Sequence, residues 1–193
     1  MKKYFWDYVF LITIALIIVI LDQWTKNMVR TLIPLGQSWS PWSWLEPYVR
    51  IVHWQNTGAA FGMFQRFGMV FTVLAFIVSI GILYYYPQVP RKDWAMRLAM
   101  AMMLGGAVGN LIDRLTQGTV TDFVSVGTFA VFNVADACIS VGTLILILAL
   151  WNSERKQKKL AEASQLQSLL SPEPPEIQEQ LDTPPDPESH PVE

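Results

Sequence analysis

Four long apolar stretches dominate the pattern of hydrophobic and polar positions along the 193-residue chain. They run from about residue 8 to 29, 67 to 86, 94 to 112 and 134 to 151. Each approaches the roughly 20 residues that a helix needs to cross about 30 Å of hydrocarbon. Because lipid offers no hydrogen-bond partners to an isolated strand, these stretches predict four transmembrane helices.

The segment between the first two apolar stretches, residues 30–66, carries two further patterns. Four aromatic side chains lie within ten positions: Trp39, Trp42, Trp44 and Tyr48. Such clustering is typical of the membrane–water interface. Residues 49–56 are β-branched and partly alternating, as are residues 120–126, and this favours strands. We therefore expect an α-helical membrane protein of four spans, with a small extracytoplasmic sheet and an interfacial, aromatic-rich element.

Composition supports this class and divides the chain. Hydrophobic residues make up 52% and charged residues 16% of the sequence, whereas soluble domains average about 25% charged residues. Residues 1–151 hold ten Lys and Arg against seven Asp and Glu, while residues 152–193 hold four against nine together with seven prolines. The sequence thus predicts a membrane domain over 1–151 and a disordered, acidic, Pro-rich tail over 152–193.

Basic residues gather in the segments on one side of the predicted spans. They occur at positions 2–3, 91–92 and 155–159. By the positive-inside rule both termini are expected to be cytoplasmic, and segments 30–66 and 113–133 face outward.

Several function classes are excluded because the sequence lacks the residues or motifs that they require. No basic stripe is dense enough for nucleic-acid binding. One cysteine and two histidines argue against an internal disulfide, a cysteine zinc site or a two-histidine metal site. The sequence has no H-E-x-x-H, G-x-S-x-G or Walker-type motif. We therefore expect none of these metal, serine-nucleophile or phosphate-binding sites.

Polar side chains within the apolar pattern gather at the outward ends of the predicted spans. Seven carboxylates and amides from four segments do so: Asp22, Asn56, Asn110, Asp113, Asp122, Asn133 and Asp136. Such groups are costly in a membrane and by default mark function. The pattern predicts one polar site near the outer face.

Some of these residues also have structural interpretations. Asp22 and Lys26 are spaced for an i, i+4 ion pair on one helix face. Asp113 and Arg114 could form an interfacial charge pair or support a neighbouring carboxylate. Asn133 is placed to cap the fourth span. Close helix packing accounts for two G-x-x-x-G spacings, at 58–62 and 105–109.

Asp122 and Asp136 have no basic neighbour in sequence except the distant Arg114. Two carboxylates brought together cannot both ionise cheaply, so they share a proton. One can then activate water as a base, while the other protonates the scissile carbonyl or the leaving amine. This favours an aspartyl peptidase. Two alternatives stay open: a small proton-coupled transporter or channel subunit, and a non-catalytic lipid-binding or scaffold protein.

Five short motifs over residues 1–151 resemble those of lipoprotein signal peptidase (signal peptidase II), a family of bacterial inner-membrane aspartyl peptidases. They are DQWTK at 22–26, NTGAAFG at 56–62, GGAVGNLIDR at 105–114, VTDF at 120–123 and FNVAD at 132–136. The resemblance implies four transmembrane helices with a small extracytoplasmic β-cradle.

The resemblance also implies substrate and site. The substrates would be prolipoproteins whose lipobox cysteine carries diacylglycerol, cut just before that cysteine without a cofactor. Asp122 and Asp136 match the catalytic pair. Substrate-binding and supporting positions are Asn56, Gly58, Asn110, Arg114, Asn133, Asp22, Lys26 and Asp113. We expect a monomer in the inner membrane, in contact with lipids and binding no nucleic acid.

Overall fold

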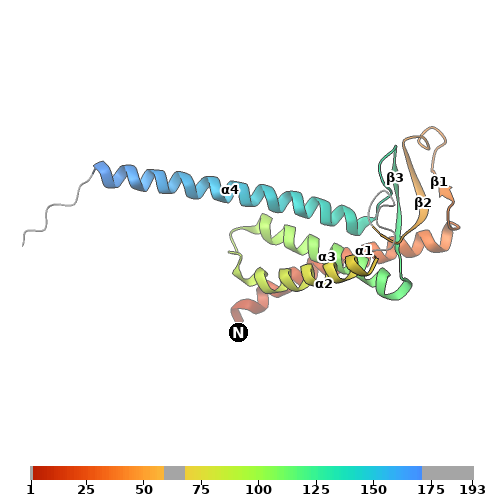
Figure 1. Ribbon diagram of the computed structural model, residues 1–193, viewed down its shortest axis with the longest axis horizontal. Coiled ribbons are helices and arrows are strands. Elements are labelled where there is room, and N and C mark those ends of the chain that lie inside the picture. The colour runs from red at the N-terminus through yellow and green to blue at the C-terminus, as the bar shows by residue number, and fades with distance from the viewer. Residues whose placement is uncertain (1, 59–67, 171–193) are drawn as a thin grey trace, which may run out of the picture. The chain divides into compact units, whose positions relative to one another are not determined.

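Four long helices make up most of the computed structural model, which describes residues 2–58 and 68–170. They are α1 (Lys2–Leu32), α2 (Gly68–Tyr85), α3 (Trp94–Gln117) and α4 (Val134–Leu170) (Figure 1). A 3-10 turn, η2 (Tyr86–Gln88), follows α2. Within the described ranges all four helices are long and apolar enough to cross a membrane. The predicted helical membrane fold is confirmed.

The end of α4 differs from the prediction. Disorder was expected from residue 152, but α4 continues to Leu170, so the prediction was wrong for residues 152–170. All seven prolines of the expected tail follow Leu170, whereas residues 152–170 are rich in Lys, Glu, Gln, Leu and Ala, which favour helix. The prediction treated residues 152–193 as one segment, so the prolines after Leu170 hid the helix-favouring composition of residues 152–170. Residues 171–193 lie outside the described residues. The chain divides into two compact units, Met1–Glu154 and Arg155–Glu193. The first contains the sheet and the packed helices α1 to α3.

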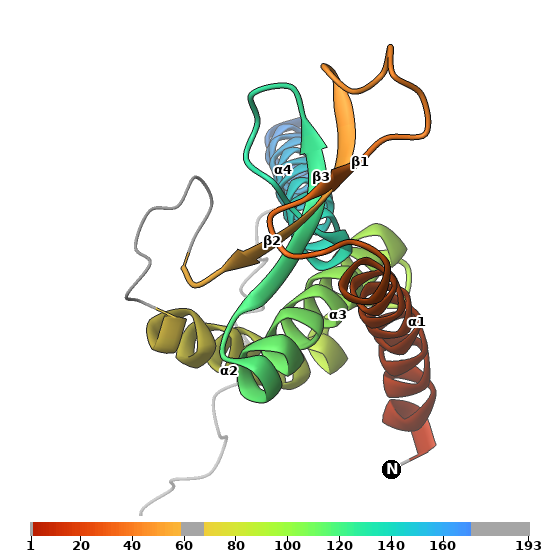
Figure 2. The same ribbon diagram turned by 90° about the vertical axis from the view of Figure 1, so that its right-hand side faces the viewer.

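A small antiparallel sheet accompanies the helices (Figure 2). Its order is β1 (Ser38–Trp39), β2 (Val49–Asn56), β3 (Val120–Val126). The two longer strands cover the predicted residues, while the two-residue β1 was not predicted. A register shift falls between Ile51 and Trp54 of β2, after which Trp54 pairs with Asp122. The sheet thereby brings the end of the 30–58 segment against the chain that follows α3.

The helices pack around α3. Of the residues in its apolar window, 61% are buried, against 11% for α2, so α3 is central and α2 peripheral. Buried side chains from α1, α2, η2 and α3 form one cluster: Leu11, Ala15, Ile82, Tyr86, Met100, Ala101 and Leu104. Arg97 lies over the ring of Tyr86, 4.3 Å from its centroid.

Glycines on α3 allow the close approach of its neighbours. A Cβ at Gly105 would lie 2.9 Å from the carbonyl oxygen of Ala15 on α1. A Cβ at Gly109 would lie 2.6 Å from Oδ2 of Asp22. The prediction of close packing is confirmed for 105–109. In the 58–62 spacing, Gly62 lies outside the described residues.

The aromatic segment that runs from the end of β1 to the start of β2 is solvent- or lipid-accessible. Trp39, Trp42, Trp44 and Tyr48 are all exposed, and the rings of Trp42 and Trp44 stack with centroids 6.1 Å apart. Their placement at a membrane interface stays a prediction.

Candidate active site

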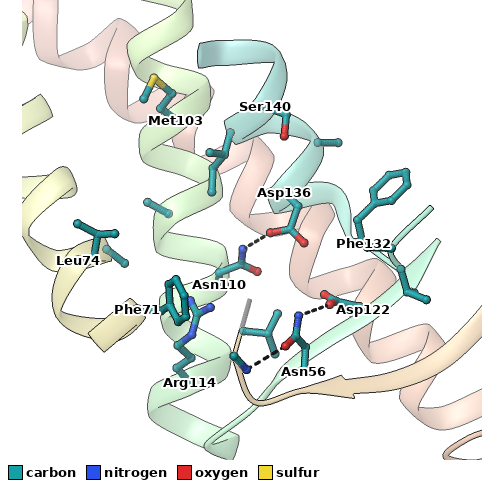
Figure 3. A pocket seen from close by; sticks show the side chains of 18 of the residues that line it. Asn56, Phe71, Leu74, Met103, Asn110, Arg114, Asp122, Phe132, Asp136 and Ser140 are labelled. Atoms are coloured by element: carbon teal, nitrogen blue, oxygen red, sulfur yellow. Dashed lines mark hydrogen bonds between the residues drawn. The ribbon is translucent and has the colours of Figure 1, made fainter. Parts of the chain in front are cut away.

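A cavity of about 620 Å³ opens between α2, α3, β3 and the first turns of α4. Carboxyl, amide and guanidinium groups form one part of its wall, and apolar side chains form much of the rest. Six of the predicted site residues line it: Asn56, Gly58, Asn110, Arg114, Asp122 and Asp136. Figure 3 shows Asp122 and Asp136 pointing toward one another from β3 and α4.

Asp122 is held by two side-chain amides. Its side chain is almost fully buried, at 1% exposure. Asn56 donates from Nδ2 to Oδ2 of Asp122 at 2.9 Å, and Asn133 donates from Nδ2 to Oδ1 at 2.7 Å. The backbone N–H of Gly58 donates to Oδ1 of Asn56 at 2.9 Å, which fixes the orientation of that amide. Both oxygens of the carboxyl group are therefore fixed in direction.

Asp136 occupies the first turn of α4. Asn110 donates from Nδ2 to its Oδ1 at 2.7 Å, and the backbone N–H of Asn133 approaches its Oδ2 at 3.3 Å. The free N–H groups at the start of a helix favour a negative charge there. The helix terminus thus suits a carboxylate facing the cavity.

Asn133 links the two carboxyl groups. Its Oδ1 accepts from the backbone N–H of Asp136 at 2.9 Å, while its own backbone N–H returns to the Asp136 side chain, the reciprocal pattern of a capping box. The predicted N-cap is confirmed. The Nδ2 of the same side chain serves Asp122 and also Oδ1 of Asn110 at 3.2 Å. One residue therefore starts α4 and contacts both carboxyl groups.

Amides, not cations, hold these two carboxyl groups. Within residues 2–58 and 68–170 no ion pair within 4.0 Å reaches Asp122 or Asp136. Burial, followed by the nearby negative charge of Asp136, raises the pKa of Asp122 to about 7, against the opposing hydrogen bonds from Asn56 and Asn133. Near neutral pH the pair can therefore hold one proton.

A second cluster lies behind the first, away from the cavity; we call Asp22, Lys26, Arg30 and Asp113 the buried ionic layer. Lys26 Nζ lies 2.7 Å from Oδ2 of Asp22 and 3.3 Å from Oδ2 of Asp113, and all three side chains are fully buried. The predicted i, i+4 pair is confirmed. Lys26 also donates to Oδ1 of Asn110 at 3.0 Å, so the Asn110 amide turns its Nδ2 toward Asp136.

Asp113 acts as a support rather than as a partner of Arg114. It forms ion pairs with Lys26 and Arg30, and it accepts from the backbone N–H of Thr121, next to Asp122, at 3.0 Å. Arg114 lines the cavity instead, with its guanidinium 5.8 Å from the ring centroid of Phe71. Of the two interpretations given for this pair, the structure favours support of a neighbouring carboxylate.

Asp22 connects the buried ionic layer to α4. Its Oδ1 accepts from the backbone N–H of Ala135 at 2.9 Å, so it satisfies one of the free N–H groups at the start of that helix. The buried ionic layer therefore joins α1, α3 and α4 on the side of Asp122 and Asp136 that faces away from the cavity.

Residues 14–152 match the family described as Signal peptidase (SPase) II. The chain belongs to this family. It is 40% identical over 150 residues to a lipoprotein signal peptidase from Halalkalibacterium halodurans, covering 76% of this chain and 94% of the relative. It is 36% identical over 143 residues to one from Streptococcus pneumoniae, covering 73% and 92%.

The fold is also similar to a solved bacterial membrane enzyme. The two structures align with a TM-score of 0.69 at 30% identity, over 75% of this chain and 88% of the other. Membership of the signal peptidase II family favours the peptidase interpretation of the cavity over the transporter and scaffold alternatives.

Sequence reasoning missed three contributors to this candidate site: Gln23, Arg30 and Thr121. Gln23 donates to Oδ1 of Asp113 at 3.0 Å, and Arg30 contacts both Asp113 and Thr121. The i, i+4 spacing of 22, 26 and 30 was a signal for Arg30, because it places all three on one face of a helix. Thr121 had no comparable signal. No group of three His, Cys, Asp or Glu within the described ranges could hold a metal ion.

Proposed function

We propose that this chain is a membrane aspartyl endopeptidase that removes signal peptides from diacylglyceryl-modified prolipoproteins. Its family is that of signal peptidase II, and its relatives at 40% and 36% identity are named lipoprotein signal peptidases. Cleavage falls just before the lipidated cysteine. The observation that carries the proposal is the facing pair Asp122 and Asp136, held by amides in a cavity that is otherwise largely apolar.

The cavity suits a substrate with both a peptide bond and a lipid group. Beside the two carboxyl groups, its wall is formed by apolar side chains from three helices: Leu74, Val78, Met103, Ala107 and Ile139. Acyl chains on the cysteine remain in apolar surroundings, so the bond before that cysteine is confined near the polar wall. Binding energy from the lipid can thereby position the scissile bond.

The two carboxyl groups supply both proton transfers. The ionised group removes a proton from a water molecule as its oxygen attacks the scissile carbonyl carbon, and the protonated group donates its proton to the carbonyl oxygen. In the collapse of the tetrahedral intermediate, the group that took the water proton gives it to the leaving nitrogen. The other group regains a proton from the hydroxyl. The pair ends with one proton, as it began.

The surrounding residues position and stabilise this chemistry. Asn56, Asn110 and Asn133 keep the carboxyl oxygens directed at the cavity. Arg114 supplies a positive charge at the cavity wall, which can stabilise negative charge that develops on the carbonyl oxygen. Asp22, Lys26 and Asp113 act from behind, through Asn110 and β3. No metal or organic cofactor takes part.

We place the protein in the bacterial inner membrane, as a monomer with both termini cytoplasmic. The site then lies at the outer end of the spans, where the lipid-modified cysteine of a translocated precursor meets the membrane surface. The exposed aromatic segment at residues 39–48 lies at the same interface.

A cleavage assay tests the proposal. Purified protein in detergent is given a synthetic lipobox peptide with a diacylglyceryl cysteine, and the same peptide without lipid, with products identified by mass spectrometry. We expect cleavage only before the lipidated cysteine. Asp122→Asn and Asp136→Asn should abolish it, while Asp93→Asn, in the loop between η2 and α3, serves as the matched control.

Two results contradict the proposal. One is a folded wild-type protein that leaves the lipidated peptide intact. The other is an Asp122→Asn or Asp136→Asn variant that cleaves at the wild-type rate. Proton flux into liposomes would then test the transporter alternative.

A further inference from the structure

The strand residue that precedes Asp122 is anchored on the face away from the cavity. Successive side chains of a strand point to opposite faces, so Thr121 and Asp122 face opposite ways. Asp122 lines the cavity, and Thr121 is 1% exposed without lining it. Arg30 Nε donates to Oγ1 of Thr121 at 2.8 Å. A side chain of α1 thus holds the back of β3 at the point where its front carries a carboxyl group.

Arg30 joins three elements at this point. Its Nη2 lies 2.9 Å from Oδ1 of Asp113 on α3, while its Nε reaches β3. With the Gln117 amide oxygen turned toward it, the guanidinium also donates from Nη1 at 2.6 Å to the last turn of α3. Its side chain is only 19% exposed. The planar guanidinium donates from several nitrogens in fixed directions, whereas an ammonium donates from a single atom.

The main chain of Thr121 is held by the same carboxylate. Its backbone N–H donates to Oδ2 of Asp113 at 3.0 Å, while the Asp113 Oδ1 receives Arg30. Thr121 is therefore fixed through both side chain and backbone by one connected group of residues. By contrast, the hydrogen bonds to the Asp122 side chain come from Asn56, which lines the cavity, and from the buried Asn133.

We propose that Arg30 is a positioning residue that fixes β3 through Thr121 and so sets where the Asp122 carboxyl group lies relative to Asp136. This inference rests on the proposed function for its kinetic consequence. Arg30 lines no part of the cavity, so it acts on the reaction through the residues it contacts, and its direct contact with β3 is Thr121. Loss of the contact between Arg30 and Thr121 leaves substrate binding intact. It reduces the fraction of bound substrate for which the carboxyl groups of Asp122 and Asp136 are correctly aligned.

The test compares Arg30→Met with Arg30→Lys, and uses Arg50→Met as the matched control. Arg50 lies exposed on β2 of the same sheet, so its replacement removes an equal charge without touching this contact. We expect Arg30→Met to lower kcat on the lipidated peptide about tenfold or more with KM within twofold of wild type. Arg30→Lys should restore only part of kcat, and Arg50→Met should behave as wild type.

A second pair of variants, at Thr121, tests the same contact if Arg30→Met fails to fold. Thr121→Val removes the hydroxyl acceptor at nearly constant volume, whereas Thr121→Ser retains it. We expect Thr121→Val to lower kcat and Thr121→Ser to stay close to wild type. Arg30→Met and Thr121→Val should also be non-additive in combination, because both remove one contact.

Hydrogen exchange separates this inference from the proposed function. Arg30→Met should speed amide exchange in residues 120–126, and Arg50→Met should not. If the wild type fails to cleave the lipidated peptide while this exchange difference appears, the proposed function fails and the anchoring of β3 stands. The inference is overturned if Arg30→Met and Thr121→Val both have the kcat of the wild type and also its rate of amide hydrogen exchange in β3.

Discussion

Two groups of carboxylates lie back to back in this molecule and are held by different chemistry. In the buried ionic layer, Asp22 and Asp113 pair with Lys26 and Arg30 at 2.7 to 3.3 Å. On the cavity side, Asp122 and Asp136 receive amide and backbone N–H donors at 2.7 to 3.3 Å. Asn110 lies between them, accepting from Lys26 and donating to Asp136.

The difference in partners separates support from chemistry. A buried carboxylate paired with a cation is held by charge attraction, and removing either partner leaves an uncompensated buried charge. A carboxylate held by neutral amides can exchange a proton at a smaller cost. The ionic layer therefore fixes the helices, and the amide-held pair is left able to cycle between protonation states.

The largest effect should come from the amide-held pair. Asp136→Asn removes a proton-transfer group while keeping the size and one acceptor of the side chain. We expect the rate of lipopeptide cleavage to fall by about 10³-fold or more, with the thermal unfolding midpoint nearly unchanged. A variant that lost its fold and its activity together would place Asp136 with the supporting layer instead.

In the buried ionic layer, a substitution should have its main effect on the stability of the protein. Asp113→Asn leaves the fully buried Lys26 and the largely buried Arg30 with one carboxylate fewer. Removing one partner of a buried ion pair costs about 3–5 kcal/mol of unfolding free energy. Unfolding in detergent, followed by tryptophan fluorescence, should show this loss, with Asp93→Asn as control. Unchanged stability would mean that the layer does not hold the helices together.

The pH dependence of cleavage should report the amide-held pair alone. The folded-state pKa of Asp122 is raised from 3.8 to about 7 by burial and the Asp136 charge. Activity requires the form with one proton, so kcat/KM should fall tenfold per pH unit above about 7, as Asp122 ionises. On the acid side it should fall again as the base is protonated. A rate that keeps rising through pH 9 would contradict a shared proton.

A smaller effect should separate the two tasks of Asn133. Serine can still cap α4 through its hydroxyl oxygen, but it lacks the Nδ2 donor to Asp122. We expect Asn133→Ser to lower kcat about tenfold with little change in stability. Asn133→Ala should lose the cap as well, at about 1 kcal/mol. Equal stability in the two variants would show that the cap contributes nothing.

The far end of α1 provides the smallest expected effect on activity. There Asp7 pairs with Arg97 at 2.8 Å and with Arg91 at 2.9 Å. This cluster resembles the ionic layer in its chemistry but lines no part of the cavity. Asp7→Asn should therefore reduce thermal stability and leave kcat and KM within twofold of wild type. A marked loss of kcat in a folded Asp7→Asn protein would contradict this separation.

Much of this arrangement could be predicted from the sequence, for a physical reason. Membrane helices and half-buried strands have simple periodicities, so the spans and both longer strands were located, with β2 and β3 over the predicted residues. Polar residues at or near the membrane-facing ends of apolar stretches are costly, and this singled out Asp122 and Asp136. The i, i+4 rule found the Asp22–Lys26 pair.

What escaped prediction depends on contacts between distant segments. Thr121 has its role only because β3 lies against Arg30 of α1, 91 residues away. Asp7 had no assigned partner, because Arg97 meets it across 90 residues. The helix over 152–170 was missed because composition was averaged over a segment whose prolines all lie beyond Leu170.

The protonation state of Asp122 itself tests most directly whether the two carboxyl groups share one proton. Infrared difference spectroscopy across a pH titration would detect the carbonyl stretch of a protonated carboxyl group near neutral pH. We predict one such band, which disappears as the pH rises through about 7 and is absent in Asp122→Asn, while the control Asp93→Asn leaves it in place. A spectrum with no protonated carboxyl group at pH 6, in protein that cleaves the lipidated peptide, would contradict the account.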